Sequence, residues 1–166
     1  MNKGIEIYKH SGVYTLHSTQ IINTSIQNVW DYFSNPENLN QMTPADMHFR
    51  ITSGLSKQMY AGMIISYKVK VLPMIHMSWI TEITNVEPLK YFIDVQLFGP
   101  YTLWHHQHHF EEQEDGVLMT DIVTFKIPFG IFGKIASSFV KKKLIGIFTF
   151  RHDFIEEKFN SKFNKD

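Results

Sequence analysis

The segment from Trp104 to Phe110 reads WHHQHHF and carries four of the nine histidines of the chain. Side chains alternate between the two faces of a β-strand, so one face would carry Trp104, His106, His108 and Phe110. The large aromatic residues indicate that this face points inward, because aromatic side chains bury large apolar areas. Two imidazoles at alternate positions would then project into the interior, about 7 Å apart at their Cα atoms.

A carboxylate is predicted beside these imidazoles. Asp115-Gly116 is the strongest turn signal in the chain, and it would join the histidine-rich strand to a following strand in a hairpin. A two-residue turn there places Phe110 opposite Asp121 and puts Asp121 diagonal to His108, within side-chain reach. The same alternation predicts an inner face made of Met119, Asp121, Val123 and Phe125. A buried carboxylate among apolar neighbours needs a partner, and a His–Asp hydrogen bond would supply one.

Three kinds of chemistry suit two inward imidazoles near a carboxylate. His-x-His on a strand is a known metal-ligand pair, but it needs a third ligand, for which Asp121, His76 and Asp94 are the candidates. A His–Asp pair is also suited to general acid–base catalysis, although no nucleophile or oxyanion-stabilising motif accompanies it. We favour the third interpretation, a polar network inside a cavity that is structural or hydrogen-bonded to a ligand, with no metal ion and no cofactor.

Arg151 is a second candidate polar group. It lies within four positions of the apolar residues Ile147, Phe148, Phe154 and Ile155, so it would lie on or beside the buried stripe of the final helix. A guanidinium there either pairs with Asp121 or Asp94, or binds an anionic group of a ligand. The internal ion pair is the favoured interpretation, because buried charges are usually paired within the protein.

A sheet and a long helix must position these side chains. The pattern predicts a first strand over 13–22, a helix that begins at Thr24 with Gln27 completing a capping box, and a second short helix that begins at Pro36. Six further strands are then predicted, at 47–52, 63–71, 77–83, 91–98, 101–111 and 117–127. An apolar stripe at helical spacing predicts one long helix over 132–160.

The order of these elements indicates an α+β fold. Consecutive strands with short links form an antiparallel meander, and a twisted antiparallel sheet curls around a helix with a wide apolar stripe. We therefore predict a curved antiparallel sheet of about six or seven strands around a long C-terminal helix, with two short helices after the first strand. A curved sheet rarely touches a straight helix everywhere, so a cavity between them is expected. The whole chain, 1–166, is predicted to be one domain with a core over about 13–160.

Composition narrows the function classes. The chain has 166 residues, with 16 Lys and Arg against 16 Asp and Glu, so it lacks the basic balance of a nucleic-acid-binding protein. It has no cysteine, which excludes disulfides and thiolate metal sites. The first residues contain no signal-peptide pattern and no apolar run reaches the length of a membrane span, so a cytoplasmic location is expected.

The chain resembles the SRPBCC superfamily, also called START-like or Bet v 1-like, and is most similar to its bacterial ligand-binding, polyketide-cyclase-like branch. The segments that carry this resemblance, in order, are Asn38 to Pro44, Gly99 to Phe110, Asp121 to Gly130 and Ile147 to Arg151. Pro44-Ala45 stands where some members have a Pro-Pro pair, a difference confined to a loop. The resemblance implies a helix-grip domain with a hydrophobic tunnel between the sheet and the C-terminal helix.

Members of this superfamily bind lipids, sterols, hormones or polyketides, and some are cyclases or aromatases. We therefore expect binding of a small hydrophobic ligand that is lipid-, polyketide- or aromatic-like, with neither nucleic acid nor a membrane span involved. The alternatives are a cyclase- or hydrolase-type enzyme that uses the His–Asp pair, and an interaction protein with a collapsed interior. The expected ligand-binding residues are Phe98, Trp104, His106, His108, Phe110, Asp121, Phe125 and Arg151.

Overall fold

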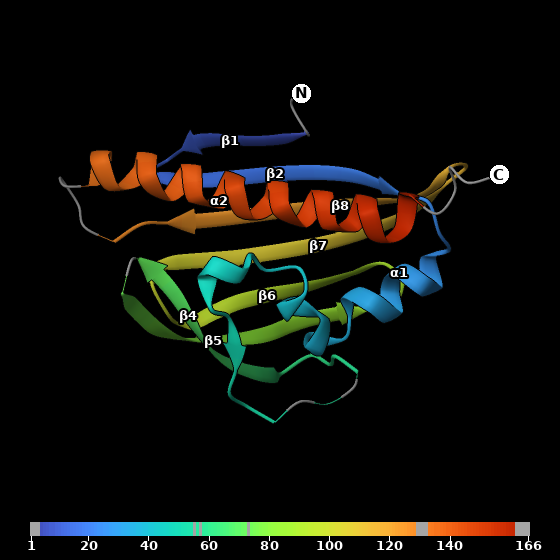
Figure 1. Cartoon of the computed structure of the whole chain (residues 1–166), viewed down its shortest axis with the longest axis horizontal. Helices are drawn as coiled ribbons and strands as arrows, with labels where there is room; N and C mark the ends of the chain where they lie inside the picture. The colour runs from blue at the N-terminus through green and yellow to red at the C-terminus, as the bar shows by residue number, and fades with distance from the viewer. Residues whose placement is uncertain (1–3, 55, 57, 73, 129–132, 162–166) are drawn as a thin grey trace.

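The computed structural model describes residues 4–54, 56, 58–72, 74–128 and 133–161. A single antiparallel sheet of eight strands, in the order β1-β2-β8-β7-β6-β5-β4-β3, curves beside the long helix α2 (Gly133–Ile155) (Figure 1). The strands are β1 (Ile5–His10), β2 (Val13–Ile22), β3 (Arg50–Ile51), β4 (Met63–Leu72), β5 (Ile75–Glu87), β6 (Tyr91–Phe98), β7 (Leu103–Gln113) and β8 (Gly116–Lys126). The α+β class and the predicted order of sheet and helix are thus confirmed.

The helix α2 packs against β1 and β2, and its inner side faces the sheet. Leu144, Phe148 and Ile155 are buried on the predicted apolar stripe, and the helix continues into a π-helical segment, Glu156–Asn160. Phe129, Gly130 and Phe132 lie outside the described residues, so the predictions made for them are not addressed. Among the helices of the described ranges, none combines the length and the apolar character that crossing a membrane requires.

Two strand predictions were wrong. The edge strand β1 was not predicted, because Ile5 is its one buried residue and the remaining positions are polar or partly exposed. The strand predicted over 47–52 is reduced to β3, which pairs only with Lys68 and Tyr67 of β4. Its first part is instead a 3₁₀ turn, η2 (Ala45–Met47), which ends at His48 in the left-handed conformation. A backbone in that conformation cannot continue an extended strand.

The two short helices follow β2 as predicted, but the N-cap of the first lies one residue later. Ser25, rather than Thr24, is the N-cap of α1 (Ile26–Phe33): its backbone is extended, and its Oγ accepts a hydrogen bond from the backbone N–H of Asn28. The hydroxyl of Thr24 accepts from the side chain of Asn28 instead. The second helix is a 3₁₀ helix, η1 (Pro36–Asn40), with Pro36 in its first turn.

The register of the β7–β8 hairpin differs from the prediction by two residues. Glu114 and Asp115 form the turn and Gly116 pairs with Gln113, so His108, not Phe110, lies opposite Asp121. Gly116 has a φ of +133°, and a Cβ there would collide with the carbonyl oxygen of Ile22. Glycine is therefore required at this position because the backbone of Ile22 comes close to it, and not because the turn needs it. A shift of two residues preserves the alternation, and the inner face is the predicted one.

The buried side chains form two main clusters. One lies between α2 and the middle of the sheet, and its members include Leu16, Val69, Trp79, Trp104, Val123, Phe125, Leu144 and Phe148. The other joins α1 to the opposite end of the sheet, and its members include Val29, Trp30, Phe33, Phe92, Phe110, Val117, Met119 and Ile155. Figure 1 shows α1 at one end of the sheet, beside the C-terminal end of α2.

Candidate functional site

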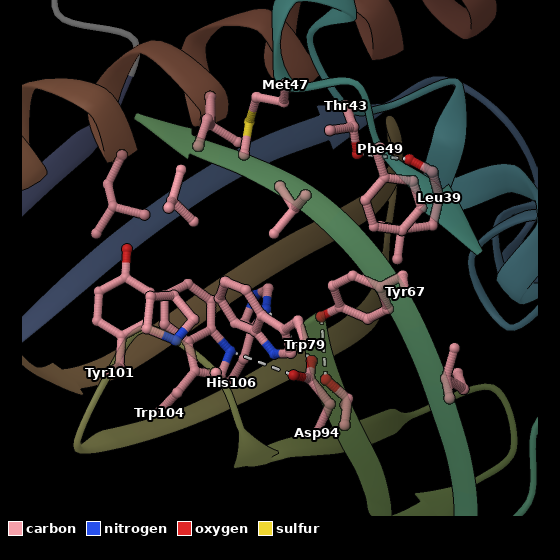
Figure 2. Close-up of a pocket in the computed structure, with 18 of the residues that line it drawn as sticks. Leu39, Thr43, Met47, Phe49, Tyr67, Trp79, Asp94, Tyr101, Trp104 and His106 are labelled. Carbon is pink, nitrogen blue, oxygen red and sulfur yellow. Dashed lines mark hydrogen bonds and ion pairs between the residues drawn. The ribbon is translucent and has the colours of Figure 1, made fainter. Parts of the chain in front are cut away.

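A cavity of about 620 Å³ lies between the sheet and α2. Its wall is mostly apolar and aromatic, and Figure 2 shows these side chains converging on one space from β4, β5, β6, β7 and the segment after η1. The lining residues include Leu39, Met47, Phe49, Ile65, Tyr67, Val69, Trp79, Tyr101, Trp104, Leu144 and Phe148. The predicted gap between the curved sheet and the helix is therefore present as a cavity.

Strand alternation explains why these residues line the cavity. Ile65 and Val69, which line the cavity, are buried on the inner face of β4, and the lysines of that strand, Lys68 and Lys70, lie at the alternate positions. On β5 and β7 the same period of two brings Trp79 and Trp104 inward, with their ring centroids 5.1 Å apart and nearly perpendicular. The two indoles form an aromatic wall beside the polar residues of the cavity.

Two histidines and two aspartates form a buried cluster at the cavity. His106 Nε2 donates a hydrogen bond to Asp121 Oδ1 at 2.9 Å, and His108 Nε2 donates to Asp94 Oδ2 at 3.1 Å. The remaining ring nitrogens face the same carboxylates crosswise: His106 Nδ1 lies 3.4 Å from Asp94 Oδ2, and His108 Nδ1 lies 2.9 Å from Asp121 Oδ1. The two imidazoles are adjacent, with centroids 3.7 Å apart, and thus lie between Asp94 and Asp121.

Two further side chains hold this cluster in place. Trp104 Nε1 donates a hydrogen bond to the second oxygen of Asp94 at 3.3 Å. Both residues are labelled in Figure 2. Arg151 Nη1 lies 3.8 Å from Asp121 Oδ1, and its guanidinium stacks over the ring of Phe148 at 5.0 Å. The predicted internal ion pair of Arg151 with Asp121 is present.

Contacts within the cluster shift the pKa values of Asp94, Asp121 and His106. Burial alone would raise the pKa of Asp94 and of Asp121, but the charges of His106 and His108 and their hydrogen bonds outweigh it and hold both pKa values well below the ordinary range. For His106, burial lowers the pKa, yet the charge of Asp94 and the hydrogen bonds to Asp121 and Asp94 raise it above its ordinary value. The arrangement therefore favours two carboxylates and a protonated His106.

Several buried N–H groups at the cavity have no acceptor among the described residues. Trp79 Nε1 and Arg151 Nε are in this state, and both residues line the cavity. Both groups are donors only, so neither can be satisfied by a neighbouring donor. Burying a donor without an acceptor costs free energy, and an oxygen atom of a bound molecule would remove that cost.

The structure brings most of the predicted site residues together, with exceptions. Trp104, His106, His108 and Arg151 line the cavity, and Asp121 lies directly behind the histidines. Phe110 and Phe125 are buried in the two core clusters rather than in the lining. Phe98, at the end of β6, is 57% exposed and does not line the cavity. Its exposure arises because β6 meets β5 through irregular pairing near Ile80 and Thr81.

Other lining residues were not assigned to the site from the sequence. Asp94 was considered only as a metal ligand or as a partner of Arg151, although its position directly across from His106 makes it the second carboxylate of the cluster. Tyr67 and Trp79 belong to the strands predicted over 63–71 and 77–83 and were given no role in the site. The alternation of β4 and β5 contained the signal for both, since every inward residue there is a candidate lining residue.

No protein-family model matches this sequence, and no curated protein matches it. Solved structures do match. A protein from Arthrobacter aurescens has a TM-score of 0.69 at 13% identity, over 93% of this chain and 92% of the other. Protein Ms6760 from Mycobacterium smegmatis has a TM-score of 0.65 at 13% identity, over 92% of this chain and 96% of the other.

A third structure, Ara h 8.0201, is a Bet v 1-like protein that matches with a TM-score of 0.57 at 14% identity. The match covers 89% of this chain and all of that one, 100%. Likeness at such low identity reports on the fold rather than on function. With its antiparallel sheet, its long C-terminal helix and these neighbours, the chain has a Bet v 1-like fold.

Proposed function

We propose that this chain binds a small hydrophobic ligand that carries at least one oxygen acceptor, in the cavity between the sheet and α2. The single observation that carries the proposal is the cavity itself, about 620 Å³ of space with a largely apolar wall. Sites for small molecules commonly measure about 300–1,000 Å³ and combine apolar walls with a few polar groups. A lipid-, polyketide- or aromatic-like molecule fits this description.

The polar groups suggest how the ligand is oriented. Trp79 Nε1 and Arg151 Nε are buried donors without an acceptor among the described residues, and both belong to the lining. A carbonyl or carboxylate oxygen would accept from them. Trp104 would contact the apolar body of the ligand, while His106 and His108 would border its polar end. In this proposal Asp121, Phe110 and Phe125 support these residues from behind.

The geometry favours binding over the cyclase or hydrolase alternative. Both ring nitrogens of His106 face aspartates, at 2.9 Å and 3.4 Å, rather than the open space of the cavity. A general base needs a ring nitrogen within hydrogen-bond reach of the proton that it removes. We therefore assign the histidines to orientation of the ligand and not to proton transfer.

A cavity-filling variant tests the proposal. Val71 lines the cavity from β4, and Val95 on β6 is equally half-buried but does not line it. We expect Val71→Phe to weaken binding of an anilinonaphthalene sulfonate, an aromatic anion, by about tenfold or more, because the added ring occupies the cavity. Val95→Phe should leave the affinity unchanged. Fluorescence titration measures both, and native mass spectrometry of gently purified protein shows whether a small molecule co-purifies.

Equal affinity in the wild type and Val71→Phe would contradict the proposal, as would a wild-type protein that neither retains a small molecule nor binds the probe. Thermal unfolding of the two variants checks that each is folded at the temperature of the titration.

A further inference from the structure

We propose that Asp94, His106 and His108 bind a divalent transition-metal ion whose open coordination position faces the cavity. One ligand atom from each of the three residues lies within 4.8 Å of the other two. Two imidazoles and one carboxylate are a ligand set typical of zinc and of non-haem iron(II). This inference goes beyond ligand binding and does not require it, since the ion could bind with the cavity otherwise empty.

The distances suit one ion. In a tetrahedral site with bonds of about 2.05 Å, neighbouring ligand atoms lie about 3.3 Å apart. Asp94 Oδ2 lies 3.4 Å from His106 Nδ1 and 3.1 Å from His108 Nε2. These two separations match the tetrahedral spacing, and the third, between the two imidazole nitrogens, is within 4.8 Å, so the rings would move closer together to share one ion.

The outer contacts are those that metal-bound histidines make. A ligating histidine usually donates its other ring N–H to a carboxylate, which fixes the tautomer and the orientation of the ring. His106 Nε2 and His108 Nδ1, the nitrogens turned away from Asp94, both lie 2.9 Å from Asp121 Oδ1. His106 Nε2 makes a hydrogen bond there, whereas His108 Nδ1 has no hydrogen-bond partner among the described residues and would gain one from Asp121 by a small rotation of its ring. Asp94 is held in turn by Trp104 Nε1 through its other oxygen. One carboxylate thus serves as the ligand, and a second one is hydrogen-bonded to His106 and lies close to His108.

The charge of the cluster also favours a cation. Asp94 and Asp121 contribute two negative charges and Arg151 one positive charge, so neutral imidazoles leave one net negative charge in a buried site. Buried charge requires compensation, which either a proton on His106 or a metal ion supplies. A divalent ion would leave one net positive charge at the cavity, which suits an anionic oxygen of a bound molecule.

Cobalt and zinc provide the test. Full-length protein is treated with a chelator, dialysed and titrated with Co²⁺ while visible absorbance is recorded, and Zn²⁺ is then added in competition. We expect one Co²⁺ per chain, with the intense bands of a four-coordinate ion, and displacement by Zn²⁺. His108→Gln and Asp94→Asn should lower the affinity at least about 100-fold, and Asp121→Asn about 10- to 100-fold.

Two control variants exclude other histidines. His105→Gln removes an imidazole from the outer face of β7, and His76→Gln disrupts a pair near the surface in which the rings of His48 and His76 lie 5.9 Å apart. Both variants should bind Co²⁺ within about twofold of the wild type, since neither residue belongs to the cluster. Retention of binding in His108→Gln together with its loss in His76→Gln would overturn the proposal.

A measurement on the wild type alone tests the metal site without relying on the stability of any variant. Spectra of the ¹⁵N-labelled histidine rings, recorded on the wild type with and without Zn²⁺, should show changes confined to two mutually adjacent imidazoles. A wild-type protein that takes up no Co²⁺ or Zn²⁺ at micromolar concentrations overturns the metal site. The anilinonaphthalene sulfonate titration of Val71→Phe would still report separately on the cavity.

Discussion

At the scale of single residues, His106 is the most constrained group of the site. Its side chain is 6% exposed, and its ring nitrogens face Asp121 at 2.9 Å and Asp94 at 3.4 Å. Breaking a buried pair of this kind is costly, because the remaining charge has no partner and little water. The protonation of His106 is therefore linked to the stability of the fold.

This linkage predicts a stability maximum in mildly acidic solution for the metal-free protein. The pKa of Asp94 and of Asp121 is lowered by folding, so their contribution is present above about pH 4 and is lost as the pH falls further. The pKa of His106 is raised, so its contribution is present below about pH 6.5 and is lost as the pH rises through the folded value. Thermal unfolding of chelator-treated protein from pH 3 to about pH 9 measures the profile.

The matched variants are His106→Gln and His105→Gln, which alter the inner and the outer face of the same strand. His106→Gln should flatten the alkaline side of the profile, whereas His105→Gln should keep the wild-type shape. An unchanged alkaline side in His106→Gln would show that another group causes the decline.

Part of this cluster could be predicted from the sequence. Alternation alone brought His106, His108 and Asp121 to one face, and an error of two residues in the register did not alter that result. The role of Asp94 could not be predicted in the same way. Its partners His106, His108 and Trp104 lie on β7, so its role depends on the register in which β6 pairs with β7. A shift of one residue in that pairing would place Asp94 opposite an outward-facing residue, and the local pattern did not fix the register.

At the scale of elements, one hydrogen-bonded contact joins α2 to the far side of the cavity. Lys143 Nζ donates to the carbonyl oxygen of Val71 at 2.9 Å and to that of Lys70 at 3.3 Å. The pairing of β4 with β5 is irregular between Lys70 and Leu72, which leaves backbone acceptors for the lysine. Burial lowers the pKa of Lys143, and the residue also lines the cavity. Lys143 therefore connects the helix to β4 beside the cavity.

We expect Lys143→Met to loosen this contact. Methionine keeps a long apolar side chain but removes both hydrogen bonds, each worth about 1 kcal/mol. Dissociation of anilinonaphthalene sulfonate, followed by stopped-flow fluorescence, should become about fivefold faster. The neighbouring residue Lys142 lies on the exposed side of α2, and Lys142→Met serves as the control. Equal rates in both variants would show that the lysine does not limit exit from the cavity.

The hairpin between β7 and β8 shows where a turn motif misleads. Asp-Gly is the expected pair at the centre of a two-residue turn, yet here the glycine opens β8. The close approach of the Ile22 backbone to Gly116 explains the position, because only glycine leaves room for it. This contact joins residues far apart in the sequence, so the local pattern could not reveal it.

At the scale of the whole molecule, one core cluster packs an end of the sheet and the other borders the cavity. The cluster around α1 is built on edge-to-face contacts of Trp30 with Phe92 and Phe110, at 6.2 Å and 6.0 Å, and packs one end of the sheet. The cluster between α2 and the middle of the sheet borders the cavity. The order of strands and helices was predictable because hydrophobic periodicity is local. A cavity between the curved sheet and the helix was predicted as well, but its lining residues on β4 and β5 were not assigned to the site from the sequence.

This division predicts which tryptophans sense a bound molecule. Trp79 and Trp104 line the cavity, whereas Trp30 lies in the α1 cluster and is not part of the lining. Bromine quenches indole emission only over short distances, so a brominated medium-chain fatty acid reports contact with the nearest indoles. Trp30→Phe should retain most of the quenching seen in the wild type, and the double variant Trp79→Phe/Trp104→Phe should lose most of it. Steady-state fluorescence during titration with the brominated acid, and with its unbrominated counterpart as a control, measures the difference. Quenching that disappears in Trp30→Phe instead would place the ligand at the α1 end and contradict the assignment of the cavity.

Thermal unfolding of each variant must show a cooperative transition, because loss of an indole from either cluster removes buried apolar contacts that also stabilise the fold.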